Sequence, residues 1–239
     1  MEFNKFAKLM EDKLNILNIK LSKEQLEKFY RYMKLLLEWN EKMNLTAIIE
    51  PEEMITKHFI DSLAVTKHIE ANDKVIDIGT GAGFPGIPLR IAREDISCTL
   101  LDSLNKRIMF LDQMIEELKL KDIKTIHARA EELGAKKEYR ETHNIAVSRA
   151  VAPLNVLLEY MSCYVVVGGK CICMKGPNIE KELEESKQAI KVLGLEILKI
   201  ENIELPGTDN IRNILILKKN FTTASRYPRQ TGKIRKTPL

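Results

Sequence analysis

The sequence predicts an α/β fold, a doubly wound and mainly parallel sheet that follows an N-terminal helical extension. Short apolar strands alternate with helical segments from residue 72 onward, which is typical of repeated strand–helix units. A glycine-rich loop lies directly after the first buried strand and before a helix, the order found at ligand-binding turns of such sheets. The first 70 residues instead repeat apolar side chains at helical spacing.

The N-terminal region is predicted to contain three helical stretches. The first has one apolar face, formed by Phe3, Phe6, Met10 and Leu14. The second begins at Ser22, because Ser22 and Gln25 have the spacing of a capping box. The third begins at Pro51, since proline is tolerated in the first turn of a helix. We therefore expect a helical extension at residues 1–70, an α/β domain at 71–219 and a tail at 220–239.

Seven apolar runs are predicted to form the sheet. They lie at residues 75–78, 97–102, 125–128, 145–147, 170–174, 195–203 and 212–217. Helices are expected between them, one beginning near Ile87 and others at 108–118, 154–167 and 179–193. Gly168 and Gly169 are interpreted as the turn between helix 154–167 and the next strand.

The composition is that of an ordinary globular chain. Of 239 residues, 44% are apolar and 30% are charged, which leaves ample material for a core. The apolar runs are shorter than the roughly 18 residues that span a bilayer, and charges near the N-terminus argue against a secretory signal. Four cysteines without C-x-x-C spacing and four scattered histidines predict neither a disulfide scaffold nor a metal site. We expect a cytoplasmic monomer with no membrane or metal partner.

The charge of the chain is unevenly distributed. Residues 210–239 hold eight basic and no acidic residues, so the other 209 residues carry 30 basic against 34 acidic groups. A basic tail on a mildly acidic body favours contact with the phosphates of a nucleic acid, although a solvated terminal segment would look the same. Pro228, Gly232 and Pro238 favour an extended or looped conformation there, remote from the glycine loop.

The glycine loop from Asp77 to Gly86 can be interpreted in two ways. Its last three glycines fit G-x-G-x-x-G, a dinucleotide pattern, while Asp77 and the first three glycines fit the D-x-G-x-G-x-G loop of S-adenosylmethionine (SAM) methyltransferases. The second interpretation is favoured, because an acidic residue suits a cationic ligand and Phe84–Pro85 removes donors that a pyrophosphate needs. Asp102 ends the next strand, where a carboxylate accepts from ribose hydroxyls. A tight turn without a ligand is the third alternative.

Several further segments match one known family. They are Asn44–Ile48, His58–Leu63, Val75–Leu89, Leu101–Arg107, Ala128–Glu131, Ser148–Ala152, Lys175–Gly176 and Tyr227–Leu239. In these segments the chain closely resembles the glucose-inhibited division protein B family, the bacterial 16S ribosomal RNA guanine-N7 methyltransferases. The resemblance runs nearly end to end. It departs in the tail, where Gln230, Thr231 and Ile234 replace the expected Lys, Arg or Pro.

The resemblance implies a Rossmann-like class I SAM-dependent methyltransferase that acts on N7 of a guanine in 16S ribosomal RNA of the small subunit. SAM is the implied cofactor. The residues expected to bind it are Asp77, Gly79, Gly81, Gly83, Phe84, Asp102, Ser103, Ala130, Glu131 and Arg149. No general base is expected, because guanine N7 carries a lone pair and no proton. Arg149 and Lys175 are the candidates for a role in the transfer itself.

Several of these residues also have simpler interpretations. Arg149 ends a strand at the ligand edge but would otherwise be a surface charge, and Glu131 would favour a helix start. Asn44, His58 and Asp61 lie in the helical extension, where only the resemblance makes them candidates for closing the pocket or guiding RNA.

Three alternative functions stay open from the sequence. The chain is either a SAM-dependent methyltransferase of another RNA position or of a protein, a NAD-dependent oxidoreductase, or a SAM-binding RNA chaperone without catalysis. The overlapping glycine pattern keeps the second alternative open.

Overall fold

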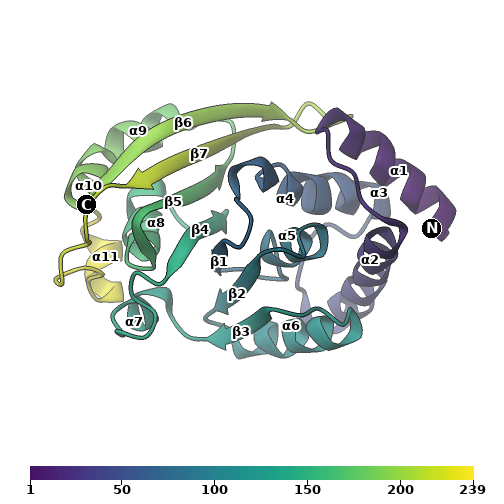
Figure 1. The fold of residues 1–239 in the computed structure, drawn as a ribbon, viewed down its shortest axis with the longest axis horizontal. Coiled ribbons are helices and arrows are strands. Elements are labelled where there is room, and N and C mark those ends of the chain that lie inside the picture. The colour runs from purple at the N-terminus through teal and green to yellow at the C-terminus, as the bar shows by residue number, and fades with distance from the viewer.

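The computed structural model describes residues 1–239 and contains one seven-stranded sheet with helices on both faces (Figure 1). The strand order is β3-β2-β1-β4-β5-β7-β6. The strands are β1 Lys74–Ile78, β2 Ser97–Asp102, β3 Ile123–His127, β4 His143–Arg149, β5 Val165–Lys175, β6 Leu195–Glu204 and β7 Ile211–Lys219. The first five are parallel, and β7 runs antiparallel between β5 and β6. The predicted doubly wound, mainly parallel fold is confirmed.

The N-terminal helices cover one part of the sheet. They are α1 Phe3–Ile16, α2 Lys23–Met43, α3 Pro51–Met54, a π-helix Ile55–Ile60, α4 Asp61–Leu63 and a 3₁₀-helix Thr66–His68. The predicted capping box begins α2: the Ser22 hydroxyl accepts from Gln25 N–H, and the Gln25 side chain accepts from Ser22 N–H. These helices share a buried core with α5 Gly86–Ala92 and α6 Asn105–Glu117. The extension is therefore packed onto the sheet domain.

The remaining helices pack on the opposite face of the sheet. They are α7 Ala130–Gly134, α8 Leu154–Ser162, α9 Glu180–Glu185, α10 Lys187–Val192 and α11 Thr231–Lys236. Alternation along β1 divides the core between the two faces, because Ile76 and Ile78 pack with α8 whereas Val75 packs with Leu89 of α5. None of the helices combines the length and apolar character needed to cross a bilayer.

The predicted helix 154–167 is wrong in its last five residues. The helix α8 ends at Ser162, and β5 begins at Val165 and continues through Gly168 and Gly169. β-Branched valines at 165–167 favour a strand. The glycines lie in an irregularity of the strand and do not form a turn, because Val165 pairs with His143 while Lys170 already pairs with Ile145.

The predicted extended tail is also wrong. Residues Thr231–Lys236 form α11, a short helix whose Ile234 is fully buried in the core beside α8. Burial of this side chain and of Tyr227 outweighs the weak helix tendency of Gly232. The tail is thus folded onto the body and lies at the opposite end of the molecule from α1 and α2 (Figure 1).

Candidate functional site

The strand order reverses between β1 and β4, and the candidate residues gather at the carboxyl ends of the strands there. β1 pairs with β2 on one side and with β4 on the other. Crevices form outside strand ends at such a reversal and bind ligands in open α/β sheets. The glycine loop follows β1, Asp102 ends β2, Ala130 and Glu131 begin α7 after β3, and Arg149 ends β4.

The Asp77 carboxylate holds the two ends of the glycine loop together. Asp77 is fully buried, and its Oδ2 accepts from the Thr80 hydroxyl at 2.6 Å and from Gly86 N–H at 2.8 Å. Its Oδ1 is buried without a partner. Burial raises the pKa of Asp77 to about 7, which the two hydrogen bonds and Arg149 partly oppose. Asp77 thus fixes the conformation of the loop through Thr80 and Gly86.

The glycines of the loop face different surroundings. A Cβ on Gly81 would meet no atom within 4 Å, and the φ of +63° at this position is one that side chains rarely adopt. A Cβ on Gly79 would lie 2.6 Å from the side chain of Val151. Gly83 faces inward, because a Cβ there would lie 2.7 Å from the Tyr32 hydroxyl. The open side of the loop is therefore at Gly81, whereas Gly79 lies against Val151.

Asp102 connects the glycine loop to the β2–α6 connection. Its Oδ2 accepts from Gly81 N–H at 2.9 Å and from the Arg107 guanidinium at 3.1 Å, and its Oδ1 accepts from Leu104 N–H at 2.9 Å. A carboxylate has about four acceptor positions, so one is left for a ligand hydroxyl. Asp102 also lines the cavity described next.

A cavity of about 100 Å³ lies over the ends of β1, β2 and β3. Its lining includes five of the residues predicted from the sequence, namely Gly79, Asp102, Ser103, Ala130 and Glu131. Glu131 is buried and accepts a hydrogen bond from the Thr231 hydroxyl of α11. The Ala130 carbonyl accepts from the Tyr164 hydroxyl at 2.5 Å, which fixes the start of α7.

Phe84 and Arg149 lie on the side of the loop that faces the N-terminal helices. The Phe84 ring stacks with His58 at a centroid distance of 4.4 Å and with Tyr32 at 5.4 Å. The Arg149 guanidinium lies 5.0 Å from the Phe84 ring centroid. Burial, reinforced by the charge of Arg149, lowers the pKa of His58 to about 3, so His58 is neutral at pH 7.

Arg149 is bound to protein acceptors from the helical extension. It donates to the Lys57 carbonyl at 3.0 Å, to Asp61 Oδ2 at 3.1 Å and to His58 Nδ1 at 3.2 Å. Arg212 of β7 donates to the same Asp61 oxygen at 3.2 Å, and Asp61 Oδ1 is buried without a partner. Arg149 therefore connects the end of β4 to the π-helix and does not line the cavity.

Two other candidates lie outside the cavity. Lys175, at the end of β5, donates to the Ala152 carbonyl and to Glu182, both at 2.6 Å. Asn44 ends α2 in the left-handed conformation. Both therefore have evident structural roles.

Sequence reasoning missed seven of the 12 residues of the cavity wall, and three of these come from beyond the ends of β1, β2 and β3, namely Val151, Tyr160 and Arg235. Tyr160 has the pattern of a core residue of α8, and Val151 follows Ala150, whose positive φ has no sequence signal. From the sequence, Arg235 is only one of several basic residues near the C-terminus, and nothing distinguishes it from the others. The expectation that the tail is remote from the glycine loop is wrong, because Arg235 and Gly79 line the same cavity.

The chain matches the family described as GidB, rRNA small subunit methyltransferase G, over residues 25–214. It is similar to two curated proteins named ribosomal RNA small subunit methyltransferase G. That of Alkaliphilus oremlandii is 50% identical over 225 residues, which cover 93% of this chain and 94% of the relative. That of Acetivibrio thermocellus is 50% identical over 236 residues, which cover 98% and 97%.

Solved structures share the fold at low sequence identity. TYW2 of M. jannaschii, in complex with AdoMet, has a TM-score of 0.52 at 15% identity and covers 66% of this chain and 76% of its own. The ribosomal protein L11 methylase of Lactobacillus delbrueckii subsp. bulgaricus has a TM-score of 0.53 at 14% identity and covers 69% and 79%. These likenesses show a Rossmann-like methyltransferase fold.

Proposed function

Because this chain belongs to the family of ribosomal RNA small subunit methyltransferase G, we propose that it transfers the methyl group of S-adenosylmethionine to N7 of a guanine in 16S ribosomal RNA. It is a SAM-dependent methyltransferase of ribosomal RNA. The observation that carries the proposal is the family match across residues 25–214, which include the glycine loop and Asp102. We further propose that the protein acts as a monomer on RNA of the small subunit.

The glycine loop fits SAM better than a dinucleotide. A pyrophosphate needs free N–H donors at the start of the helix. In this loop, Gly81 N–H donates to Asp102, Gly86 N–H donates to Asp77, and Gly83 N–H donates to the Thr80 carbonyl. One of these acceptors is the Asp102 carboxylate, whose negative charge would repel a phosphate and attract a cationic ligand. The arrangement therefore disfavours the NAD-dependent alternative.

In our proposal, different residues of the cavity and the glycine loop contact different parts of the cofactor. The remaining acceptor position of Asp102 would take a ribose hydroxyl, and Ala130 and Glu131 after β3 would meet the adenine. The backbone from Gly79 to Gly81, which is open at Gly81, would lie along the methionine part, and Asp77 would hold the loop in shape through Thr80 and Gly86. Close approach of backbone to ligand at Gly81 is supported by the empty space where a Cβ would lie.

The proposed reaction requires the protein to position the two substrates, and it requires no proton transfer. Bound SAM supplies an electrophilic methyl group on a sulfonium. Guanine N7 has an in-plane lone pair and no proton, so the side chains need only orient the base in line and exclude water. His58, the imidazole nearest the loop, is neutral at pH 7 and is held by Thr46 and Arg149. We propose that Arg149 fixes the N-terminal helices against the loop and that Lys175 fixes the β4–α8 connection through Ala152.

Two measurements test this proposal. Thermal unfolding with SAM and, separately, with NAD should show stabilisation by SAM alone, because a ligand that binds only the native state raises its stability. Radiolabelled SAM should then transfer label to 16S RNA or to small subunits. Stabilisation by NAD alone would favour the oxidoreductase, SAM binding without transfer would favour a chaperone, and label in a protein would identify a different methyltransferase.

A further inference from the structure

The C-terminal tail forms part of the wall of the cavity at the strand ends. Arg235 of α11 lines this cavity together with Glu131 of α7 and Tyr160 of α8. In Figure 1, α11 lies beside α7 and α8, on the side of the sheet away from the N-terminal helices. The tail lies beyond residue 214, where the family match ends. Its contact with the cavity therefore comes from a segment outside the matched region.

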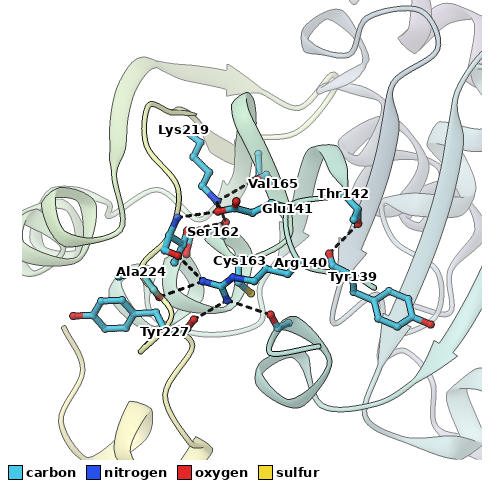
Figure 2. Close-up of polar contacts among 12 residues, drawn as sticks. Tyr139, Arg140, Glu141, Thr142, Ser162, Cys163, Val165, Lys219, Ala224 and Tyr227 are labelled. Carbon is cyan, nitrogen blue, oxygen red and sulfur yellow. Dashed lines mark hydrogen bonds and ion pairs between the residues drawn. The ribbon is translucent and has the colours of Figure 1, made fainter. Parts of the chain in front are cut away.

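The chain upstream of α11 is fixed by two cations, the half-buried Arg140 and the buried Lys219. Figure 2 shows the Arg140 guanidinium pointing at the chain between Ala224 and Tyr227, where it donates to the Tyr227 carbonyl at 2.8 Å and the Ala224 carbonyl at 3.2 Å. The fully buried Lys219 donates to Glu141 at 2.6 Å and to the Ser162 and Val165 carbonyls at 2.7 and 2.8 Å. Charge-assisted hydrogen bonds of this kind are strong, so the start of the tail is held in place.

The middle of the tail is fixed by a second, independent set of contacts. The Arg229 guanidinium donates to the fully buried carboxylate of Glu159 on α8, at 2.6 Å for the shortest contact. Ile234 and Tyr227 are buried in the core beside α8. Together these contacts determine where the helix α11 sits, and its exposed face includes Arg235.

The cavity-facing side of α11 carries polar groups that contact the predicted adenine region. Thr231 donates its hydroxyl proton to the Glu131 carboxylate. The Glu131, Tyr160 and Arg235 side chains line the same cavity, and the pKa of Tyr160 is raised by burial and by the charge of Glu131 while Arg235 opposes the rise. An arginine, a carboxylate and a phenol thus meet at one end of the cavity.

The present cavity is small for the ligand proposed above. Its volume is about 100 Å³, whereas pockets for small molecules measure roughly 300–1,000 Å³. An adenosine group bound here would therefore extend beyond the present cavity, toward the side chains at its rim. Four side chains of the lining are exposed, whereas Glu131 and Tyr160 are buried; the exposed ones are Ser103, Arg129, Val151 and Arg235. Arg235 has the freedom to move that the buried wall residues lack.

We propose that α11 forms the outer wall of the adenosine end of the cofactor pocket, with Arg235 closing over the adenine and Thr231 holding the Glu131 carboxylate. This inference rests on the proposed function, which places SAM in this cavity. A guanidinium plane stacks well on a flat aromatic system. A carboxylate held by a neighbouring hydroxyl is already oriented to accept from the adenine amino group.

Titration calorimetry with SAM tests the two α11 residues directly. Arg235→Ala and Thr231→Val should each raise the dissociation constant by about 3- to 30-fold, the range for a lost stacking or charged hydrogen-bond contact. Lys236→Ala is the matched control, because it removes an exposed cation from the same helix and leaves the cavity lining intact. Its dissociation constant should stay within about twofold of the parent value. Thermal unfolding of all variants shows whether α11 stays folded.

Limited trypsin digestion gives a second readout that does not depend on a variant. Adenosine alone should slow cleavage after Arg235, whereas methionine alone should not, because only adenosine would lie under α11. Two results overturn the inference: Arg235→Ala and Thr231→Val bind SAM as the parent does, or adenosine leaves cleavage after Arg235 unchanged. If the parent protein itself binds no SAM, the proposed function fails first, and the inference fails with it.

Discussion

The backbone N–H of Gly81 donates to Asp102 Oδ2 at 2.9 Å, and this bond joins the loop after β1 to the end of β2. Asp102 therefore stabilises the loop, whether or not it also contacts a ligand. The hydrogen bond also fixes the position of the Gly81 backbone, and the space next to the Gly81 Cα is empty. The proposed SAM site depends on this pair.

Replacing Gly81 by valine should abolish SAM binding while the protein stays folded. The new side chain would occupy the open space over the loop, at a φ of +63° that also strains valine by about 1–2 kcal/mol. Gly168→Val is the matched control, since Gly168 also has a positive φ, of +88°, and nothing within 4 Å of a Cβ, but lies in β5 away from the cavity. Calorimetry that gives Gly81→Val the SAM affinity of the control would show that the loop is not the binding site.

The pKa of Asp77 predicts how stability changes with pH. The buried carboxyl has a pKa of about 7 in the folded protein and about 3.8 in the unfolded chain. It therefore stays protonated to a higher pH in the folded protein. The unfolded chain then binds fewer protons between pH 4 and 7. The contribution of Asp77 to stability is therefore fully present below pH 4 and is lost as pH rises through 7.

Asp77→Asn should remove this dependence. The amide oxygen can still accept from Thr80 and Gly86, and the amide does not ionise. Urea unfolding at pH 5 and at pH 8 should show that the parent protein loses more free energy of unfolding between the two values than Asp77→Asn does. Equal losses in both proteins would mean that Asp77 is ionised throughout this range.

Arg229→Ala should destabilise the protein by about 3–5 kcal/mol, because it leaves the fully buried Glu159 carboxylate without its partner. Glu159→Leu in the same chain should recover much of this loss, since no buried charge then remains. Lys233→Ala, an exposed position of α11, should change stability by less than about 0.5 kcal/mol. A small effect of Arg229→Ala, measured by urea unfolding, would argue that the tail does not pack as described.

The tail's contribution to RNA binding should be smaller than its charge indicates. Of the eight basic residues at 210–239, three pair with acidic groups of the body, namely Arg212 and Lys219 of β7 and Arg229 of the tail. Lys233 and Lys236 are exposed, so replacing both with glutamine should lower the log–log slope of 16S RNA binding against salt by at most about two units. SAM affinity should not change. An unaltered slope would exclude these two lysines from the RNA contact.

The sheet and the residues at the carboxyl ends of its strands were predictable, because short stretches of sequence determine them. Apolar runs bounded by glycine and acidic residues place β1 and β2, and the D-x-G-x-G-x-G pattern places Asp77 and Gly81 at the strand end. The five predicted residues that line the cavity all follow β1, β2 or β3, where chain order alone determines their position.

The wall contributed by the tail was not predictable, because it depends on contacts across the chain. Thr231 contacts Glu131 and Arg229 pairs with Glu159, and these partners are 100 and 70 residues apart in sequence. A lone arginine in a basic tail has the same local pattern whether it is solvated or lines a cavity. Likewise, Val165–Val167 continue the apolar pattern of α8 although their β-branching favours a strand, so two local signals conflict at the end of that helix.

The central claim is methylation of guanine at N7, and one pair of RNA substrates tests it most directly. Two 16S transcripts are prepared, one with guanosine and one in which 7-deazaguanosine, which has carbon in place of N7, replaces it. With radiolabelled SAM, the account predicts label in the first transcript and none in the second, with the Gly81→Val protein as the inactive control. Equal label in both transcripts, or label in neither the RNA nor assembled small subunits, would contradict it.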